Sequence, residues 1–186
     1  MANVRIIEKD PMKEKLLKLF MEASPFHRLG EPADVILLNA CEMASIPKLR
    51  NENAVAKIIV MTDQPEYSYP ETALGMGADG FWYQKPDAEA LNGCVSAVLA
   101  GHRCFPEHTP VVKLGAAASD SFTDREREVL RQLVVGKTDA QIAEVLRCAI
   151  PTVKHYIQKI REKTGLTTRV KLAVTVRSAG LVIPEE

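Results

Sequence analysis

The 186-residue sequence lacks the features that mark membrane-spanning, secreted and metal-binding proteins. No apolar run approaches the ~18 residues that a membrane-spanning helix needs. The first ten residues, MANVRIIEKD, include charged side chains and no apolar signal segment. The four cysteines form no C-x-x-C pair and the histidines show no ligand spacing, so no metal or other cofactor is expected. These absences predict a cytoplasmic protein that does not contact a membrane.

Net charge is also absent, because 24 basic residues balance 24 acidic ones. The two parts of the chain nevertheless differ: residues 1–115 hold 12 Lys and Arg against 15 Asp and Glu, whereas 116–186 hold 12 against 9. Within 147–177 there are eight basic residues and one acidic residue, Glu162. A stretch of one sign is typical of a surface that faces phosphate groups. The 46% hydrophobic content predicts buried cores, in one large or two small domains.

The C-terminal third of the sequence predicts four short helices. Thr123 with Glu126 and Thr138 with Gln141 have the spacing of capping boxes, which begin helices. Pro151 suits the first turn of a third helix because proline has no N–H to lose there. A fourth helix is expected over Arg169 to Ser178, after a capping threonine. Two helices joined by a tight turn, the second with a polar and basic outer face, are typical of a helix-turn-helix.

Four motifs in this region carry a resemblance to a known family. T-D-R-E-R-E-V-L, Q-I-A-E-V-L, T-V-K-x-x-I-x-K-I and K-T-G-L, between Phe122 and about Val182, resemble the LuxR/NarL-type DNA-binding domain. The resemblance implies double-stranded DNA as the partner, with the third helix in the major groove. Two residues depart from the pattern: Arg147 stands where the family usually has a turn glycine, and Ala149 where it usually has a capping Ser or Thr.

The resemblance and the helix period together indicate the residues that contact DNA. Base edges are expected to meet Lys154 and His155, with Gln158 one turn further on. Phosphates are expected to meet Thr152, Lys159 and Lys163. In the family the fourth helix pairs with its copy in a homodimer, which implies a dimer interface here at Arg169, Leu172, Ala173 and Val176.

The N-terminal part alternates apolar strands with helices, which predicts a parallel, doubly wound sheet. Strands are expected at 4–7, 33–38, 56–61 and 81–83. The arrangement, over roughly residues 3–104, is similar to the receiver domain of bacterial response regulators. Too few residues separate the first helix from the next long strand for a further strand and a crossover helix. We therefore expect one of the two to be lost or vestigial.

These patterns predict an α/β plus all-α protein. It comprises a truncated, flavodoxin-like receiver-type domain at 1–104, a linker at 105–120, and a four-helix LuxR-type helix-turn-helix domain at 121–186.

The receiver resemblance implies a pocket that holds Mg²⁺ and accepts a phosphoryl group on an aspartate. The corresponding residues here are Glu8, Lys9, Asp10, Asn39, Thr62 and either Gln84 or Lys85. The acceptor position falls on Asn39, whose carboxamide cannot form an acyl phosphate. Lys9 replaces an acidic ligand, and its ammonium is expected to lie beside Glu8, Asp10 and Asn39 in place of the metal. The prediction is a vestigial site in a pseudo-receiver.

The predicted function is sequence-specific regulation of transcription by a dimer that aspartyl phosphorylation does not control, with no enzymatic activity. An alternative is an interaction protein whose two domains bind other regulatory proteins. The sequence leaves open whether the protein responds to no signal, to oxidation, to a ligand or to a protein partner. Cys41, near the vestigial pocket, is a candidate for a redox response.

Overall fold

The computed structural model describes residues 1–24, 27–66, 68–84 and 88–181. The chain divides into two compact units, one formed by residues 1–63 and 68–108 and the other by 64–67 and 109–186. Within the described residues, no helix is both long and apolar enough to cross a membrane.

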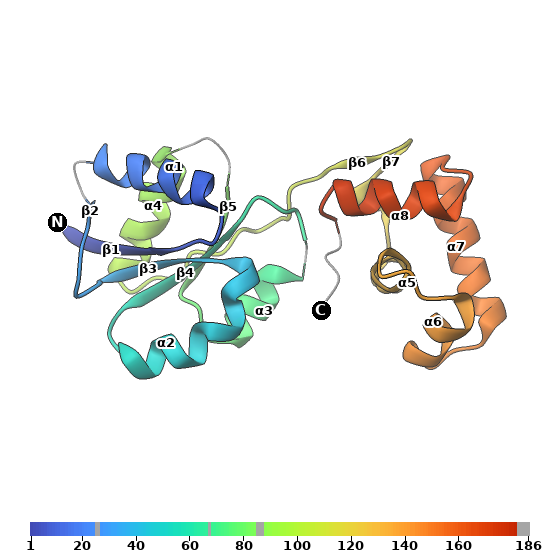
Figure 1. Ribbon diagram of the computed structural model, residues 1–186, viewed down its shortest axis with the longest axis horizontal. Helices are drawn as coiled ribbons and strands as arrows, with labels where there is room; N and C mark the ends of the chain where they lie inside the picture. The colour runs from blue at the N-terminus through green and yellow to red at the C-terminus, as the bar shows by residue number, and fades with distance from the viewer. Residues whose placement is uncertain (25–26, 67, 85–87, 182–186) are drawn as a thin grey trace. The chain divides into compact units, whose positions relative to one another are not determined.

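The first unit is built on a five-stranded sheet in which all neighbouring strands are parallel (Figure 1). The spatial order is β2-β1-β3-β4-β5. The strands are β1 (Ala2–Ile7), β2 (His27–Leu29), β3 (Val35–Asn39), β4 (Lys57–Thr62) and β5 (Gly80–Tyr83). This order and direction are those of the flavodoxin-like fold, as the sequence predicted.

Helices cover both faces of this sheet (Figure 1). One face carries α1 (Pro11–Glu22) and α4 (Ala88–Leu99), and the other carries α2 (Ile46–Glu52) and α3 (Tyr69–Gly75). A short 3₁₀ helix, η1 (Ala40–Ser45), precedes α2. Side chains of β3 alternate between the two layers: Leu37 lies in the core under α1 and α4, and Leu38 in the core under α2 and α3. Burial on both faces explains why β3 and β4 read as continuous apolar runs.

The expected truncation removes the helix between β2 and β3, while the strand β2 remains. Only residues 30–34 join the two strands, which lie on opposite sides of β1. Such a short connection suffices because the strands are staggered: β2 ends beside Val4, and β3 begins beside the same residue. The chain therefore crosses β1 without returning along it. Asn3 holds the crossing, since its side-chain amide donates to Pro32 O (2.9 Å) and its backbone N–H to Asp34 Oδ2 (2.7 Å).

The second unit contains four helices around one apolar core. They are α5 (Asp124–Val134), α6 (Asp139–Val145), α7 (Ile150–Thr164) and α8 (Arg169–Ser178). Both predicted capping boxes, at Thr123 and Thr138, are formed with both of their hydrogen bonds. A hairpin of β6 (Lys113–Leu114) and β7 (Ala117–Ala118) precedes the 3₁₀ helix η2 (Ser119–Ser121) and α5. Leu114 is fully buried among the helices, so part of the stretch expected as a linker belongs to this core.

Candidate nucleic-acid interface and the receiver-type pocket

The turn between α6 and α7 is built without the glycine that such a turn favours. Arg147 has a positive φ of 52°, in the left-handed region that side chains with a Cβ rarely adopt. The turn closes through a hydrogen bond from Cys148 N to Ala143 O (2.9 Å). Ala149 at the N-cap of α7 provides no side-chain hydrogen bond. The two departures from the family pattern are thus visible in the structure as a positive φ at Arg147 and a missing side-chain cap at Ala149. The turn forms despite both.

The helix α7 has one buried side and one exposed side. Val153, Ile157 and Ile160 lie in the core of the unit. On the other side the structure brings together four exposed side chains that were predicted to contact DNA: Lys154, His155, Gln158 and Lys159. Thr152, in the first turn, is half-buried. A helix fixed by one face and presenting donors on the other has the form required of a recognition helix.

An open groove of about 720 Å³ runs beside this exposed side. Lys154 and Gln158 line it together with Arg161 and with Arg169 from α8. The Gln158 amide donates to Glu162 Oε1 (2.9 Å), which orients it along the helix. Arg161 was not among the predicted contacts, although it falls within the basic stretch of the sequence. Its guanidinium is exposed and donates to the Thr167 carbonyl oxygen.

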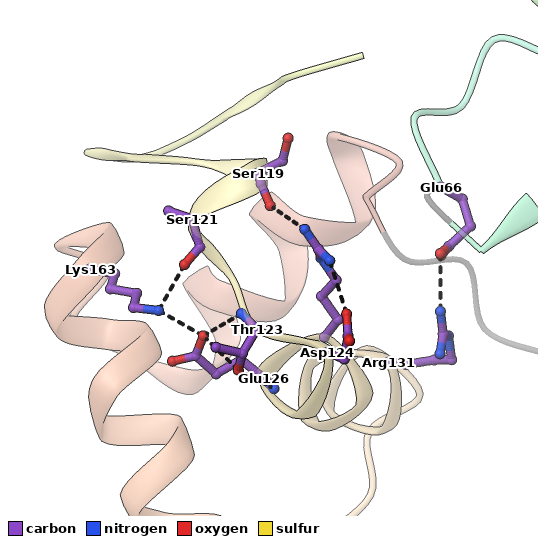
Figure 2. A network of polar contacts seen from close by, with 9 residues as sticks. Glu66, Ser119, Ser121, Thr123, Asp124, Glu126, Arg131 and Lys163 are labelled. Carbon is purple, nitrogen blue, oxygen red and sulfur yellow. Dashed lines mark hydrogen bonds and ion pairs between the residues drawn. The ribbon is translucent and has the colours of Figure 1, made fainter. Parts of the chain in front are cut away.

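Lys163 has a different environment from the one predicted. Its ammonium lies 2.7 Å from Glu126 Oε2 and 2.9 Å from the Ser121 carbonyl oxygen. Figure 2 shows the side chain of Lys163 directed towards both residues. It also lies over the ring of Phe122, 5.6 Å from the centroid. Since its donors are directed into the unit, we remove Lys163 from the proposed phosphate contacts.

Glu126, the partner of Lys163, is only 2% exposed and belongs to the first capping box. Burial alone would raise its pKa. Hydrogen bonds from Lys163 and from the backbone N–H of Thr123 outweigh burial and hold the pKa of Glu126 below its ordinary value. The carboxylate thus stays charged inside the unit and fixes α7 against the start of α5.

The predicted dimer residues of α8 need a correction. Leu172 and Val176 are fully buried in the core of their own unit, so they are not available to a second chain. Arg169 is engaged within the unit, with Nη1 at 2.5 Å from Asp139 Oδ1. The apolar side chains that α8 exposes are Val170, at 71%, and Val174, at 59%. Val170 and Val174 are four residues apart, a spacing that places them on one side of a helix. Leu172 and Val176 have the same spacing, so the sequence alone did not distinguish the exposed pair from the buried pair.

At the carboxyl end of the sheet, polar side chains of the receiver-type pocket bond to one another. The Asn39 amide donates to Glu8 Oε2 (2.6 Å), and Asn39 Oδ1 accepts from Cys41 N (2.8 Å). The other oxygen, Glu8 Oε1, accepts from Asp10 N (2.9 Å). Asp10 caps α1 by accepting from Met12 N and Lys13 N. Asn39 is thus held where the resemblance places a phosphoryl acceptor, with its amide turned towards a carboxylate.

Two further positions complete this pocket. Thr62, at the end of β4, is buried, and its carbonyl oxygen accepts from Gln84 N (2.7 Å) after β5. Lys85 lies outside the described residues, so the choice between Gln84 and Lys85 stays open.

The prediction for Lys9 was wrong. Its side chain is 82% exposed, and its ammonium lies 2.5 Å from Glu42 rather than beside the pocket carboxylates. The ammonium near those carboxylates is that of Lys13, 2.8 Å from Asp63 Oδ2. The hydrogen bond from Lys13 to Asp63, with smaller contributions from the charges of Glu8 and Asp10, raises the pKa of Lys13. Lys13 lies in the first turn of α1, and no pattern in the sequence indicated which lysine would face the pocket.

The pocket does not fit a divalent metal. Both oxygens of Glu8 accept hydrogen bonds from the protein, and the neighbouring acceptor position is a neutral amide. In the parts of the chain that are described, no group of three His, Cys, Asp or Glu side chains is arranged to hold a metal ion.

Comparison with known proteins agrees with this architecture. Residues 120–176 match the model of bacterial regulatory proteins of the luxR family. The chain is 28% identical over 183 residues to the nitrate/nitrite response regulator NarP of Escherichia coli, covering 91% of this chain and 85% of NarP. It is also 28% identical over 196 residues to the transcription regulator BvgA of Bordetella pertussis, covering 91% of this chain and 94% of BvgA.

Solved structures of response regulators share the fold. RcsB dimers bound to DNA superpose with a TM-score of 0.59 at 17% identity, covering 95% of this chain and 98% of RcsB. The response regulator ChrA gives a TM-score of 0.51 at 19% identity, with 95% and 96% covered. The relatives are transcription regulators rather than enzymes. The chain thus resembles bacterial response regulators over most of its length, and its residues 120–176 match the luxR family of bacterial regulatory proteins.

Proposed function

We propose that this protein regulates transcription as a DNA-bound dimer and that aspartyl phosphorylation does not control it. The observation that carries the DNA-binding part is that α7 is buried on one side and exposed on the other. Because Val153, Ile157 and Ile160 fix one side in the core, the side chains of Lys154, His155 and Gln158 are presented from a rigid element. Lysine donates to guanine O6 and N7, and glutamine pairs with adenine N6 and N7. The proposed phosphate contacts are Thr152 and Lys159, joined by Arg161.

Independence from phosphorylation rests on Asn39 and its partner. A side-chain amide that donates to Glu8 is neither a nucleophile nor a metal ligand in that orientation. The nearby carboxylate Asp63 is neutralised by the ammonium of Lys13. Lys13 thus offsets one of the carboxylate charges near the pocket, and both oxygens of Glu8 accept hydrogen bonds from the protein rather than being free to bind Mg²⁺.

The dimer is supported by apolar side chains that each unit exposes. On α8 these are Val170 and Val174. On α1 they are Met12, Leu16 and Leu19, whose spacing places them along one side of the helix. Exposed apolar stripes of this kind are typical of protein interfaces. RcsB, which shares the fold, binds DNA as dimers, and we infer the same assembly here.

The decisive experiment selects bound fragments from genomic DNA and then measures their affinity for three variants. Lys154→Ala should weaken binding to the selected site by about 1–3 kcal/mol and relax its sequence preference. Lys159→Ala should weaken binding to all sequences alike and lower the salt slope by about 0.9. Lys48→Ala, which removes an exposed lysine of α2, is the control and should change neither quantity. Unchanged affinity of Lys154→Ala would remove α7 as the recognition helix.

Phosphorylation is tested separately. With acetyl phosphate and Mg²⁺ the intact mass should stay constant, and beryllofluoride should leave the oligomeric state unchanged. A beryllofluoride-induced dimer of the unmodified protein would contradict the proposal.

The exposed side of α1 also favours a second candidate, binding to another regulatory protein. Leu16→Asp separates the two candidates. In the proposed regulator it weakens self-association, whereas in an interaction protein it removes the partner and leaves self-association and DNA affinity unchanged.

A further inference from the structure

Two of the four cysteines lie next to each other in the first unit, although ten residues separate them in the sequence. Cys94 is on α4, and Cys104 follows that helix. The sulfur of Cys94 lies 4.0 Å from the carbonyl oxygen of Cys104, and both side chains pack in the core under α1 and α4. We propose that this pair is a covalent modification site, which a peroxide oxidises to an intramolecular disulfide.

Backbone hydrogen bonds attach Cys104 to the edge strand β5. Phe81 N donates to Cys104 O (2.7 Å), and Cys104 N donates to Asp79 O (3.1 Å). These bonds form a parallel bridge between Cys104 and Gly80. Cys104 is therefore fixed to the sheet, and its distance from α4 is set by the packing of that helix.

The helix α4 holds Cys94 on its buried side. Leu91, Val95 and Val98 of the same helix are fully buried under the sheet, and Cys94 lies among them at 4% exposure. Gly80 keeps the space between the cysteines open. A Cβ at this position would meet Cys104 O at 3.0 Å and Cys94 Sγ at 3.4 Å. The close approach of the two cysteines thus depends on a residue without a side chain.

The two thiols differ in exposure, and this difference sets the order of a stepwise oxidation. Burial, together with the neighbouring Cys104 thiol, raises the pKa of Cys94, so Cys94 remains protonated and shielded. Cys104 is partly exposed and is the sulfur that a small oxidant reaches first. Cys94 then serves as the resolving cysteine, because it lies beside the sulfur that has been oxidised.

With hydrogen peroxide as oxidant the reaction balances in two steps. The Cys104 sulfur attacks one peroxide oxygen, the O–O bond breaks, and the thiol proton leaves with the other oxygen as water. The Cys94 sulfur attacks the resulting sulfenic acid, the S–O bond breaks, and the hydroxyl group leaves as water with the Cys94 proton. Two thiols are oxidised by two electrons and one peroxide is reduced to two waters.

The disulfide would fasten the end of the α/β unit to α4. Residues 102–104 are joined to the unit by backbone hydrogen bonds, from His102 N to Ala97 O (3.0 Å) and from Cys104 N to Asp79 O. A disulfide between Cys94 and Cys104 would make this attachment covalent. Bonds of this kind in intracellular proteins are typically transient and respond to oxidants. The modification does not depend on DNA binding, so it can be tested whether or not the proposed function holds.

The test treats the full-length reduced protein with hydrogen peroxide and then alkylates the remaining thiols with N-ethylmaleimide. Two thiols should be lost to alkylation, and dithiothreitol should restore them. Trypsin cleaves after Arg103, so Cys94 and Cys104 fall in different peptides. A disulfide-linked pair, one peptide ending at Arg103 and the other spanning 104–113, is the expected product. A disulfide that involves Cys41 or Cys148 would overturn the proposal. So would alkylation of all four thiols after the peroxide treatment, because it would show that no disulfide had formed.

Two variants and a second reagent sharpen the result. Cys94→Ser should leave a sulfenic acid at Cys104 that dimedone traps, whereas Cys104→Ser should give neither the link nor a dimedone adduct at residue 94. If a serine variant does not fold, phenylarsine oxide on the wild type gives an independent measurement, because it bridges two adjacent thiols. It should protect Cys94 and Cys104 together from alkylation while Cys41, which is exposed, still reacts. Equal alkylation of all three would contradict the pairing.

Discussion

The side-chain amide of Asn39 donates a hydrogen bond of 2.6 Å to Glu8 Oε2, at the position where receiver-type proteins have a phosphoryl acceptor. Asn39→Asp would replace this donor with a second carboxylate. Two carboxylates at this distance repel, so we expect the first unit to lose about 1–3 kcal/mol of stability near neutral pH.

Urea unfolding followed by the fluorescence of Trp82 measures this effect, because Trp82 is the chain's single tryptophan and lies on β5. The double variant Glu8→Gln with Asn39→Asp restores a donor–acceptor pair and should recover most of the stability. Equal midpoints for wild type and Asn39→Asp would show that the observed bond contributes nothing.

Arg147→Gly should stabilise the second unit by about 0.5–1 kcal/mol. Arg147 has a φ of 52°, which costs a residue with a Cβ about 1–2 kcal/mol, whereas glycine adopts it freely and loses part of the gain to chain entropy. Thermal unfolding monitored by circular dichroism checks the increase. Arg147→Ala keeps the Cβ and removes the charge, so it should give no gain. An equal rise in both variants would assign the effect to charge.

Leu172→Ala and Val174→Ala should behave differently although they lie two residues apart on α8. Leu172 is fully buried, and its truncation should cost about 2–5 kcal/mol. Val174 is 59% exposed, and its truncation should change stability by less than about 0.5 kcal/mol. Analytical ultracentrifugation adds the second measurement: Val174→Asp should weaken the dimer while the monomer stays folded. A folded Val174→Asp dimer of unchanged affinity would exclude this side of α8 as an interface.

The stability of the second unit should fall at acidic pH through Glu126. Its pKa is lower in the folded chain than in the unfolded chain, so the stability it contributes is present above about pH 4.5 and is lost as pH falls through the folded value. In Glu126→Gln this part of the pH dependence should disappear. Because the side chain of Lys163 is 34% exposed, we expect the variant to lose only about 1–2 kcal/mol near neutral pH. Parallel pH profiles for wild type and Glu126→Gln would contradict the assignment.

Features that depend on neighbouring residues in the sequence could be predicted. Capping boxes at Thr123 and Thr138 join residues three apart, and the buried strands β3 and β4 are recognised by their continuous apolar side chains. β2 was missed as a definite strand because three residues are too few to show a period. Arg147 could also be recognised from the sequence, because it stands where the family usually has a turn glycine. Its φ angle could not be predicted.

Contacts between distant residues could not be predicted. Whether Lys9 or Lys13 faces the pocket depends on where Asp10 begins α1 and on the position of Asp63 after β4. Lys163 meets Glu126 only because α7 packs against the start of α5. Leu172 was recognised as apolar, but its burial depends on the core that the other helices of the unit complete.

The direct crossing from β2 to β3 leaves part of β1 without a helical cover. Val4 is buried in the core under α1 and α4, whereas the next side chain, Arg5, is exposed and pairs with Glu31 of the crossing at 3.6 Å. For protein engineering, residues 30–34 are therefore an insertion point at which a crossover helix could be grafted without changing the register of any strand. Such a graft would have to supply hydrogen-bond acceptors for Arg5, or that arginine would have to be exchanged for an apolar residue, because a buried guanidinium without a partner would cancel the gain in apolar contact.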